Sequence, residues 1–153
     1  ACSKSTVTVT YNMHSSTDSI MNNFIKFKYI FAEWCINNSL VKASGIIGSY
    51  ASGKQNPNSD IDVIILTDKP EKFINNKNWI NTFGISDDVS VEKYGKVTSV
   101  RCFYKNGMEI EFGITSLDWA SSPIDKGTQK VISQGLNIIH DPKDKLKKLE
   151  CWD

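Results

Sequence analysis

The sequence predicts a domain of mixed α and β structure, and three observations lead to this fold class. Apolar residues recur at steps of four and three from Ile20 to Trp34, which is the pattern of an amphipathic helix. The run Val63 to Leu66 is apolar on both faces of an extended chain, which favours an interior strand. Asn106-Gly107 lies between two stretches of strand character and is a strong signal for a β-hairpin turn.

The N-terminal half is predicted to begin with a long helix and to reach a glycine-serine turn through a short strand. Ser16, Thr17 or Asp18 supplies the N-cap of the helix. The predicted elements are a leader or added edge strand over residues 1–16, a helix from about Thr17 to the Asn37-Asn38-Ser39 cluster, a strand over Leu40–Ile47 and a helical turn from Ser49 to about Gln55.

The C-terminal half is predicted to contain most of the strands. Its elements are a helix around Phe73–Ile80, strands over Val89–Tyr94, Lys96–Tyr104 and Met108–Ile114, a helix near Thr128–Gly135, a short strand over Asn137–Ile139 and a basic helix after Pro142. At 153 residues the chain is long enough for one core, so we expect residues 17–153 to form a single domain with a small helical C-terminal tail.

Composition narrows the range of partners and compartments. A net charge of +1 gives no broad basic field, so binding to a long nucleic acid is not expected. The four cysteines are far apart without metal-type spacing, which indicates reduced thiols in a cytoplasmic protein. No apolar run approaches the length of a membrane span, so no membrane partner is expected. Composition says nothing about the oligomeric state.

The first candidate site residues are Asp60 and Asp62, which open the apolar run that ends at Leu66. In an extended strand they project from the same side, roughly 6–7 Å apart at the backbone. Two unit charges at that distance repel by roughly 2–3 kcal/mol at an effective dielectric constant near 20. The pair therefore indicates a bound cation, and oxygen ligands favour Mg²⁺ or Mn²⁺ over zinc.

A glycine-serine turn precedes these carboxylates. Gly48 lets the backbone turn, and the peptide N–H groups at the start of the following helix form an anion-binding nest to which Ser49 adds a hydroxyl. A nest beside a carboxylate metal site suits a nucleoside triphosphate. Glu111 is our choice for a third carboxylate that completes a two-metal site and acts as a general base, and Glu109, on the same face of its strand, is the second choice.

Together these motifs resemble a known family. Gly48-Ser49, ten intervening residues and Asp60-Ile61-Asp62 before an apolar strand are similar to the signature of the nucleotidyltransferase superfamily that includes DNA polymerase beta. Glu109–Ile114 resembles its third-carboxylate strand. The resemblance implies a mixed sheet of about five strands flanked by helices, Mg²⁺, and transfer of a nucleoside monophosphate from ATP or another NTP to a hydroxyl with release of pyrophosphate.

The resemblance also implies roles for individual residues. Gly48 and Ser49 would contact the triphosphate, Asp60 and Asp62 both metals, and Glu111 the metal that activates the acceptor. Many members carry Arg or Lys where this chain has Ser52, so we include Lys54 as a substitute cation and Ser59, beside Asp60, as a further nucleotide contact. Tyr50 and Trp119 are either core residues or platforms for a nucleotide base.

The predicted activity is transfer of an NMP, AMP in the first instance, to a small molecule such as an aminoglycoside or to a protein side chain. Polymerase activity is not expected, because about 150 residues leave no room for separate template-binding domains. The alternative is a non-catalytic, antitoxin-like module that keeps the fold and binds a nucleotide or a partner, and Ser52 is its main support.

Overall fold

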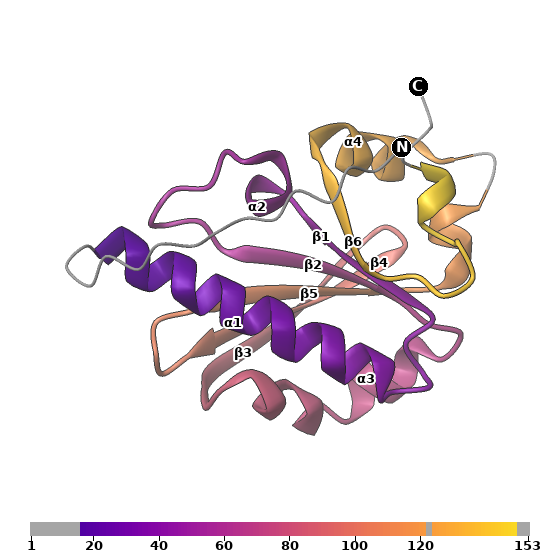
Figure 1. Ribbon diagram of the computed structural model, residues 1–153. Coiled ribbons are helices and arrows are strands. Elements are labelled where there is room, and N and C mark those ends of the chain that lie inside the picture. The colour runs from indigo at the N-terminus through magenta and orange to yellow at the C-terminus, as the bar shows by residue number, and fades with distance from the viewer. Residues whose placement is uncertain (1–15, 122–123, 150–153) are drawn as a thin grey trace.

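The fold is built on one six-stranded mixed sheet, seen in a computed structural model that describes residues 16–121 and 124–149. The strand order is β3-β4-β5-β2-β1-β6 (Figure 1). The resemblance implies about five strands, and the sheet has six, which include the expected short C-terminal strand paired with β1. The strands are β1 (Ala43–Ile47), β2 (Ile61–Leu66), β3 (Ser86–Tyr94), β4 (Val97–Tyr104), β5 (Glu109–Thr115) and β6 (Leu136–His140).

Among the described helices α1, with 21 residues, is the longest, and it runs across one face of the sheet (Figure 1). The predicted leader or edge strand lies outside the described residues, except that its last residue begins α1. None of the described helices combines the length and hydrophobicity needed to cross a membrane. The helices are α1 (Ser16–Ile36), α2 (Ser49–Ser52), α3 (Pro70–Asn75) and α4 (Lys126–Gln134), with 3-10 helices η1 (Asn78–Phe83), η2 (Leu117–Ala120) and η3 (Lys147–Leu149).

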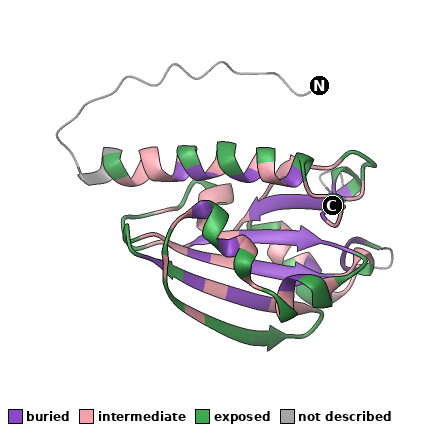
Figure 2. Ribbon diagram, turned by 90° about the horizontal axis from the view of Figure 1, so that it is seen from below, coloured by how far each residue is buried: buried purple, intermediate pink, exposed green. Residues whose placement is uncertain are grey.

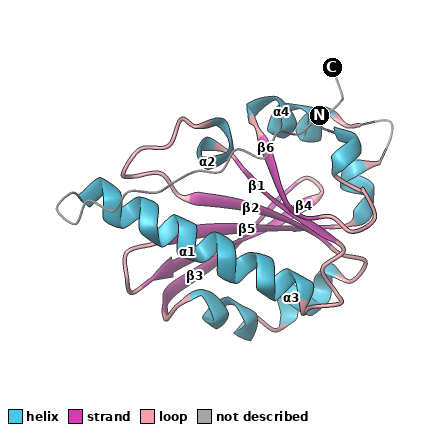
Figure 3. Ribbon diagram, in the orientation of Figure 1, coloured by secondary structure: helices cyan, strands magenta, loops and turns pink. Residues whose placement is uncertain are grey.

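Strand β2 lies in the interior of the sheet, as its apolar sequence predicts. It pairs in antiparallel fashion with β1 and in parallel with β5, while β3, β4 and β5 form an antiparallel meander (Figure 3). The predicted turn at Asn106-Gly107 joins β4 to β5, and Gly107 has φ 90°. Figure 2 shows the central strands buried and the edge strand β3 largely exposed.

The two faces of the sheet support different layers. Ile61, Val63 and Ile65 of β2 pack in a cluster with α1 and η1, whereas the alternate residues Ile64 and Leu66 pack against η2 and the C-terminal segment. Because side chains alternate along a strand, Asp62 projects from the second face. The functional face is therefore the one that α1 does not cover.

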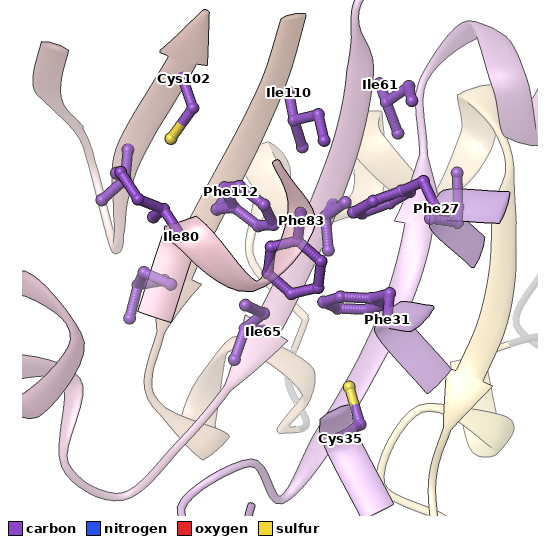
Figure 4. Packing of buried hydrophobic residues seen from close by; sticks show 14 of the residues in the cluster. Phe27, Phe31, Cys35, Ile61, Ile65, Ile80, Phe83, Cys102, Ile110 and Phe112 are labelled. Atoms are coloured by element: carbon purple, nitrogen blue, oxygen red, sulfur yellow. The ribbon is translucent and has the colours of Figure 1, made fainter. Parts of the chain in front are cut away.

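Aromatic side chains fix α1 against the sheet. Phe27 and Phe31 of α1 lie over β5, where Phe31 is fully buried and its ring centroid is 6.5 Å from that of Phe112 (Figure 4). Phe83 of η1 packs edge-on against Phe27 at 5.4 Å. The ring centroid of Trp79 lies 4.9 Å from that of Phe112. Such rings contribute large buried areas, so the sheet is held firmly beneath the functional face.

Two predicted helices are wrong in their extent. The helix expected around Phe73–Ile80 is divided into α3 and η1, because Asn76 has extended backbone angles. The basic helix expected after Pro142 does not form in the described residues up to Leu149, where turns and η3 take its place. Asp144 adopts a positive φ of 54°, and the carboxylate of Asp141 accepts three backbone N–H groups, from Lys145, Leu146 and Lys147. These local hydrogen bonds compete with a helix.

Candidate active site

The structure brings three carboxylates together on the face of the sheet that α1 does not cover. Asp60 precedes β2, Asp62 lies within it, and Glu111 is the register partner of Asp62 on β5. Each residue offers a carboxylate oxygen, and these oxygens all lie within 4.8 Å of one another. Among residues 16–121 and 124–149 this is the one group of three or more potential metal ligands.

Gly48 lies directly against this group. Its φ is 72°, a conformation that L side chains rarely adopt, and a Cβ built on it would lie 2.4 Å from Oδ2 of Asp62. Ile47, the preceding residue, pairs with Asp62 across β1 and β2. A glycine is therefore required here for two reasons: the turn into α2, and the close approach of Asp62.

Ser49 begins α2, which is a single helical turn. The carbonyl of Gly48 accepts the N–H groups of Ala51 and Ser52 at 3.1 Å each. The first N–H groups of a helix have no partner inside it, so those of Ser49 and Tyr50 are available to an external acceptor. This geometry is compatible with the phosphate nest expected from the sequence.

The other predicted nucleotide-binding residues lie on the polar loop between α2 and β2. The hydroxyl of Ser52 donates to the carbonyl of Ser49 at 3.2 Å and so closes the helical turn. Lys54 is exposed and makes no ion pair with any described residue. Ser59 accepts the N–H of Asn56 through its hydroxyl at 2.9 Å. The structure therefore brings neither Lys54 nor Ser52 to the carboxylates.

A cation that the sequence analysis did not single out lies among the carboxylates. Arg101 of β4 donates from Nη1 to Oε1 of Glu109 at 2.6 Å and from Nη2 to Oε2 of Glu111 at 2.8 Å. Its Nη1 is also 3.7 Å from Oδ2 of Asp60. Arg101 and Glu111 are register partners across β4 and β5, so the backbone pairing sets this contact.

The two candidate third carboxylates have different surroundings. Glu111 accepts a hydrogen bond from the hydroxyl of Ser99 at 2.6 Å in addition to that from Arg101, and it belongs to the carboxylate group. Glu109 contacts Arg101 but does not belong to that group. Glu111 therefore lies beside Asp62, whereas Glu109 is connected to the carboxylate group through its contact with Arg101.

Burial and, after it, the crowding of negative charge raise the pKa of both aspartates. Burial is the largest cause of the shift of the Asp62 pKa to about 8, and the charges of Asp60 and Glu111 add to it. The pKa of Asp60 is raised by burial first and then by Glu111, while Arg101 opposes the shift. One guanidinium therefore does not balance three carboxylates.

The residues present fit a divalent cation. All the donors are carboxylate oxygens, which suit hard ions such as Mg²⁺ and Mn²⁺. Burial and the neighbouring carboxylates raise the pKa of Asp62, and a cation with two positive charges would offset the part that is due to these charges. Asp60, Asp62 and Glu111 are the residues that would hold it.

The sequence analysis did not identify Arg101 and Ser99, because their contacts with Glu111 depend on the pairing of β4 with β5. The turn signal by itself gives the wrong register. A two-residue loop at Asn106-Gly107 would pair Lys105 with Met108 and place Arg101 opposite Phe112, whereas the observed three-residue loop pairs Tyr104 with Met108 and places Arg101 opposite Glu111. Alternation along β4 then places Ser99 on the same face as Arg101.

The two aromatic candidates have different environments. Tyr50 stacks on Phe24 with ring centroids 4.3 Å apart, so one of its faces is covered by protein. Trp119 is only 3% exposed and packs in the cluster with Ile64 and Leu66. Its role as a core residue is therefore clear.

The sequence matches the Nucleotidyltransferase domain family over residues 28–108, just over half of the chain. The matched segment includes the glycine-serine turn, both aspartates and the β4 arginine. The chain belongs to this family of nucleotidyltransferase domains. No curated protein sequence matches the chain.

Three solved structures are similar to the chain at low sequence identity. An aminoglycoside 6-adenyltransferase from Bacillus subtilis is 13% identical with a TM-score of 0.50, and the alignment covers 70% of this chain and 37% of that one. The polymerase core of TRAMP, an RNA surveillance complex, is 13% identical with a TM-score of 0.46 over 67% and 32% of the two chains. The Cid1 poly(U) polymerase is 15% identical with a TM-score of 0.35 over 65% and 37%. The aligned part is thus only about a third of each of these chains.

Proposed function

We propose that residues 17–153 act as one nucleotidyltransferase domain that transfers a nucleoside monophosphate, AMP from ATP in the first instance, to a hydroxyl group. The observation that carries this proposal is the placement of Asp60, Asp62 and Glu111 within 4.8 Å of one another, with Gly48 directly against Asp62. A glycine-serine turn suited to a triphosphate, beside three carboxylates suited to metal ions, supplies the groups that support transfer of a nucleoside monophosphate.

Each residue has a role in this proposal. The N–H groups after Gly48 and the hydroxyl of Ser49 bind the terminal phosphates, and Asp60, Asp62 and Glu111 hold Mg²⁺ or Mn²⁺. The bound ions supply charge neutralisation and a lower pKa for the acceptor hydroxyl. The acceptor oxygen forms a bond to the α-phosphorus, the bond to the bridging oxygen breaks, pyrophosphate leaves, and Glu111 accepts the proton.

Lys54 and Ser59, on the loop before β2, are proposed as further contacts to the nucleotide. Ser59 directly precedes Asp60, and Lys54 is an exposed cation on the same loop. The acceptor is a small molecule or a protein side chain. One similar structure carries the name of an aminoglycoside 6-adenyltransferase, which supports a small-molecule acceptor. The free, buried thiols of Cys35 and Cys102 support a reducing, cytoplasmic environment.

A second function is favoured by a specific observation. Arg101 bridges Glu109 and Glu111 and approaches Asp60, and α2 brings no cation to the phosphate turn. An arginine among the carboxylates competes with a metal for the same oxygens. This contact supports the alternative of a nucleotide-binding or partner-binding module without turnover, in which Arg101 takes the place of an ion.

The test is incubation with α-labelled NTPs, Mg²⁺ and an acceptor pool that includes cell lysate, with pyrophosphate release as the readout. We expect label transfer by the wild type, loss of transfer in Glu111→Gln, and transfer within about threefold of wild type in the matched variant Glu109→Gln. Loss in Glu109→Gln with full activity in Glu111→Gln would reverse the assignment. Nucleotide binding by calorimetry without any pyrophosphate release would favour the non-catalytic module.

A further inference from the structure

A pocket of about 550 Å³ lies at the end of the sheet opposite the carboxylates. Asp60 and Asp62 lie at the start of β2, whereas Asp68, which lines the pocket, follows its end. Lys42, another lining residue, directly precedes β1, and Ile47, the register partner of Asp62, ends that strand. The five residues from Lys42 to Ile47 span about 16 Å in an extended strand, so the pocket is separate from the candidate active site.

The charged side chains that line this pocket are mainly basic. They are those of Lys42, Lys143 and Lys145, together with His140, and Asp68 is the single acidic residue of the lining. Among residues 16–121 and 124–149, none of the three lysines forms an ion pair. Three ammonium groups against one exposed carboxylate leave the lining positively charged. We call it the basic pocket.

The segment after β6 separates charges that alternate along its sequence. His140, Lys143 and Lys145 line the basic pocket, whereas the acidic residues between them, Asp141 and Asp144, do not. The carboxylate of Asp141 is occupied by three backbone N–H groups of the turn that follows it. Asp144 has a positive φ of 54°, which is uncommon for a residue with a side chain. The local fold therefore presents the basic side chains to the pocket and keeps both carboxylates out of it.

Lys42 is held in position on the opposite wall. Its Nζ donates to the carbonyl of Ser39 at 2.9 Å, and its backbone N–H donates to the carbonyl of Leu66 at 2.9 Å. The ammonium group has three N–H donors, so two are left for another acceptor. Because Lys42 is half-buried and fixed at its base, its charge is placed at the pocket before any ligand arrives.

The end of α1 borders the basic pocket and is a competing partner for its cations, because the carbonyl end of a helix attracts positive charge. The carbonyls of Glu33 and Cys35 there already accept the N–H groups of Asn37 and Asn38. In the described parts of the chain, no lysine of the pocket donates to a carbonyl of α1. The lysines are therefore available to a ligand.

We propose that the basic pocket binds a small, dissolved phosphate ester, with the phosphate at the lysines. Phosphate oxygens accept strong charge-assisted hydrogen bonds from ammonium groups. Val41, Leu117 and Pro142 supply apolar lining for the body of the molecule. The volume lies within the range of about 300–1,000 Å³ that is typical of small-molecule sites. This site goes beyond the proposed function and does not depend on it.

The test is titration of the full chain with phenyl phosphate in EDTA, followed by ¹H–¹⁵N NMR, with phenol as the uncharged probe of the same body. We expect phenyl phosphate to cause saturable shifts of amide signals at residues 39–42 and 140–146. Phenol at the same concentration is expected to cause none, because the lysines supply the main attraction.

The double variant Lys143→Gln with Lys145→Gln is expected to weaken phenyl phosphate by roughly 10-fold or more, because two charge-assisted hydrogen bonds are lost. Lys42→Gln, on a different segment, is expected to weaken it by roughly 3–10-fold. The matched control is Lys147→Gln with Lys148→Gln, which removes the same two charges from exposed residues of η3 that do not line the pocket. It is expected to change binding less than about threefold.

Three results in variants that melt like the wild type would overturn the inference. They are the absence of saturable binding to the wild type, equal weakening in the two double variants, and shifts confined to residues 48–50. Equal weakening would show a diffuse attraction to the basic segment, and shifts at 48–50 would place the anion at the phosphate turn. Shifts at the basic pocket without pyrophosphate release would support the pocket and refute the proposed function only.

Discussion

Replacement of Asp62 by asparagine removes one charge from the carboxylate group with little change in shape. The Asp62 pKa is about 8 in the folded protein and 3.8 for an ordinary aspartate, because of burial and the neighbouring charges. The folded state therefore binds the proton more tightly than the unfolded state. It follows that the free energy of unfolding of the metal-free wild type falls as the pH rises from about 4 to about 8.

The magnitude follows from the pKa. At about 1.4 kcal/mol per pKa unit, a shift from 3.8 to about 8 sets an upper limit near 6 kcal/mol at pH 8. Asp62 is only half-buried and Arg101 is nearby, so solvent and the guanidinium screen much of this energy. We expect Asp62→Asn to stabilise the metal-free protein by about 1–2 kcal/mol at pH 8, or roughly 3–6 °C in Tm.

The assay is thermal denaturation at pH 5 and pH 8, in EDTA and in 10 mM MgCl₂. Asp62→Asn is expected to raise the Tm at pH 8 in EDTA, to change it little at pH 5, and to lose the stabilisation that Mg²⁺ gives the wild type. Asp68→Asn, at an exposed carboxylate after β2, is the control for loss of one negative charge. A lower Tm of Asp62→Asn at pH 8 in EDTA would refute the electrostatic reasoning.

Three further substitutions test the contacts around the site and the C-terminal segment. Arg101→Met leaves the carboxylates without a cation and is expected to cost about 2–3 kcal/mol in EDTA by urea denaturation, with recovery in Mg²⁺; equal stability in EDTA would contradict this. Gly48→Ala, whose Cβ would lie 2.4 Å from Asp62, is expected to lower the free energy of unfolding by at least ~2 kcal/mol. Gly53→Ala, at φ 77° with open space around it, is the matched variant and is expected to lower it by about 1 kcal/mol. Equal losses would show that the contact with Asp62 has no effect. Asp141→Ala removes three backbone hydrogen bonds and is expected to cost about 2 kcal/mol in the same assay; equal stability would show that these bonds do not stabilise the segment.

Local patterns were sufficient for most of the fold. The apolar period of α1, the two-sided apolar run of β2 and the Asn106-Gly107 turn each report on a few neighbouring residues, and the structure agrees with all three. The C-terminal segment was not predictable in this way. Its lysines resemble the exposed face of a helix, but Asp141 captures the backbone N–H groups that a helix would need.

In the candidate site, the aspartate pair could be predicted from the local sequence, whereas the third carboxylate could not. Strand alternation places Asp60 and Asp62 on one side of the chain whatever the partner strand is. The choice between Glu109 and Glu111 depends on which residue of β5 lies opposite Asp62. That register is a property of the parallel pairing of β2 and β5, two strands far apart in the sequence.

The sequence by itself determined the family, the mixed α and β fold and the pair Asp60 and Asp62, because each depends on residues close together in the chain. Tertiary structure alone decided that Arg101 lies among the carboxylates, that Gly48 contacts Asp62, and that a mainly apolar cavity lined in part by α4 adjoins Glu111. These features join residues from four strands and α4. They depend on strand register and on how α4 packs against the sheet, which no local pattern encodes.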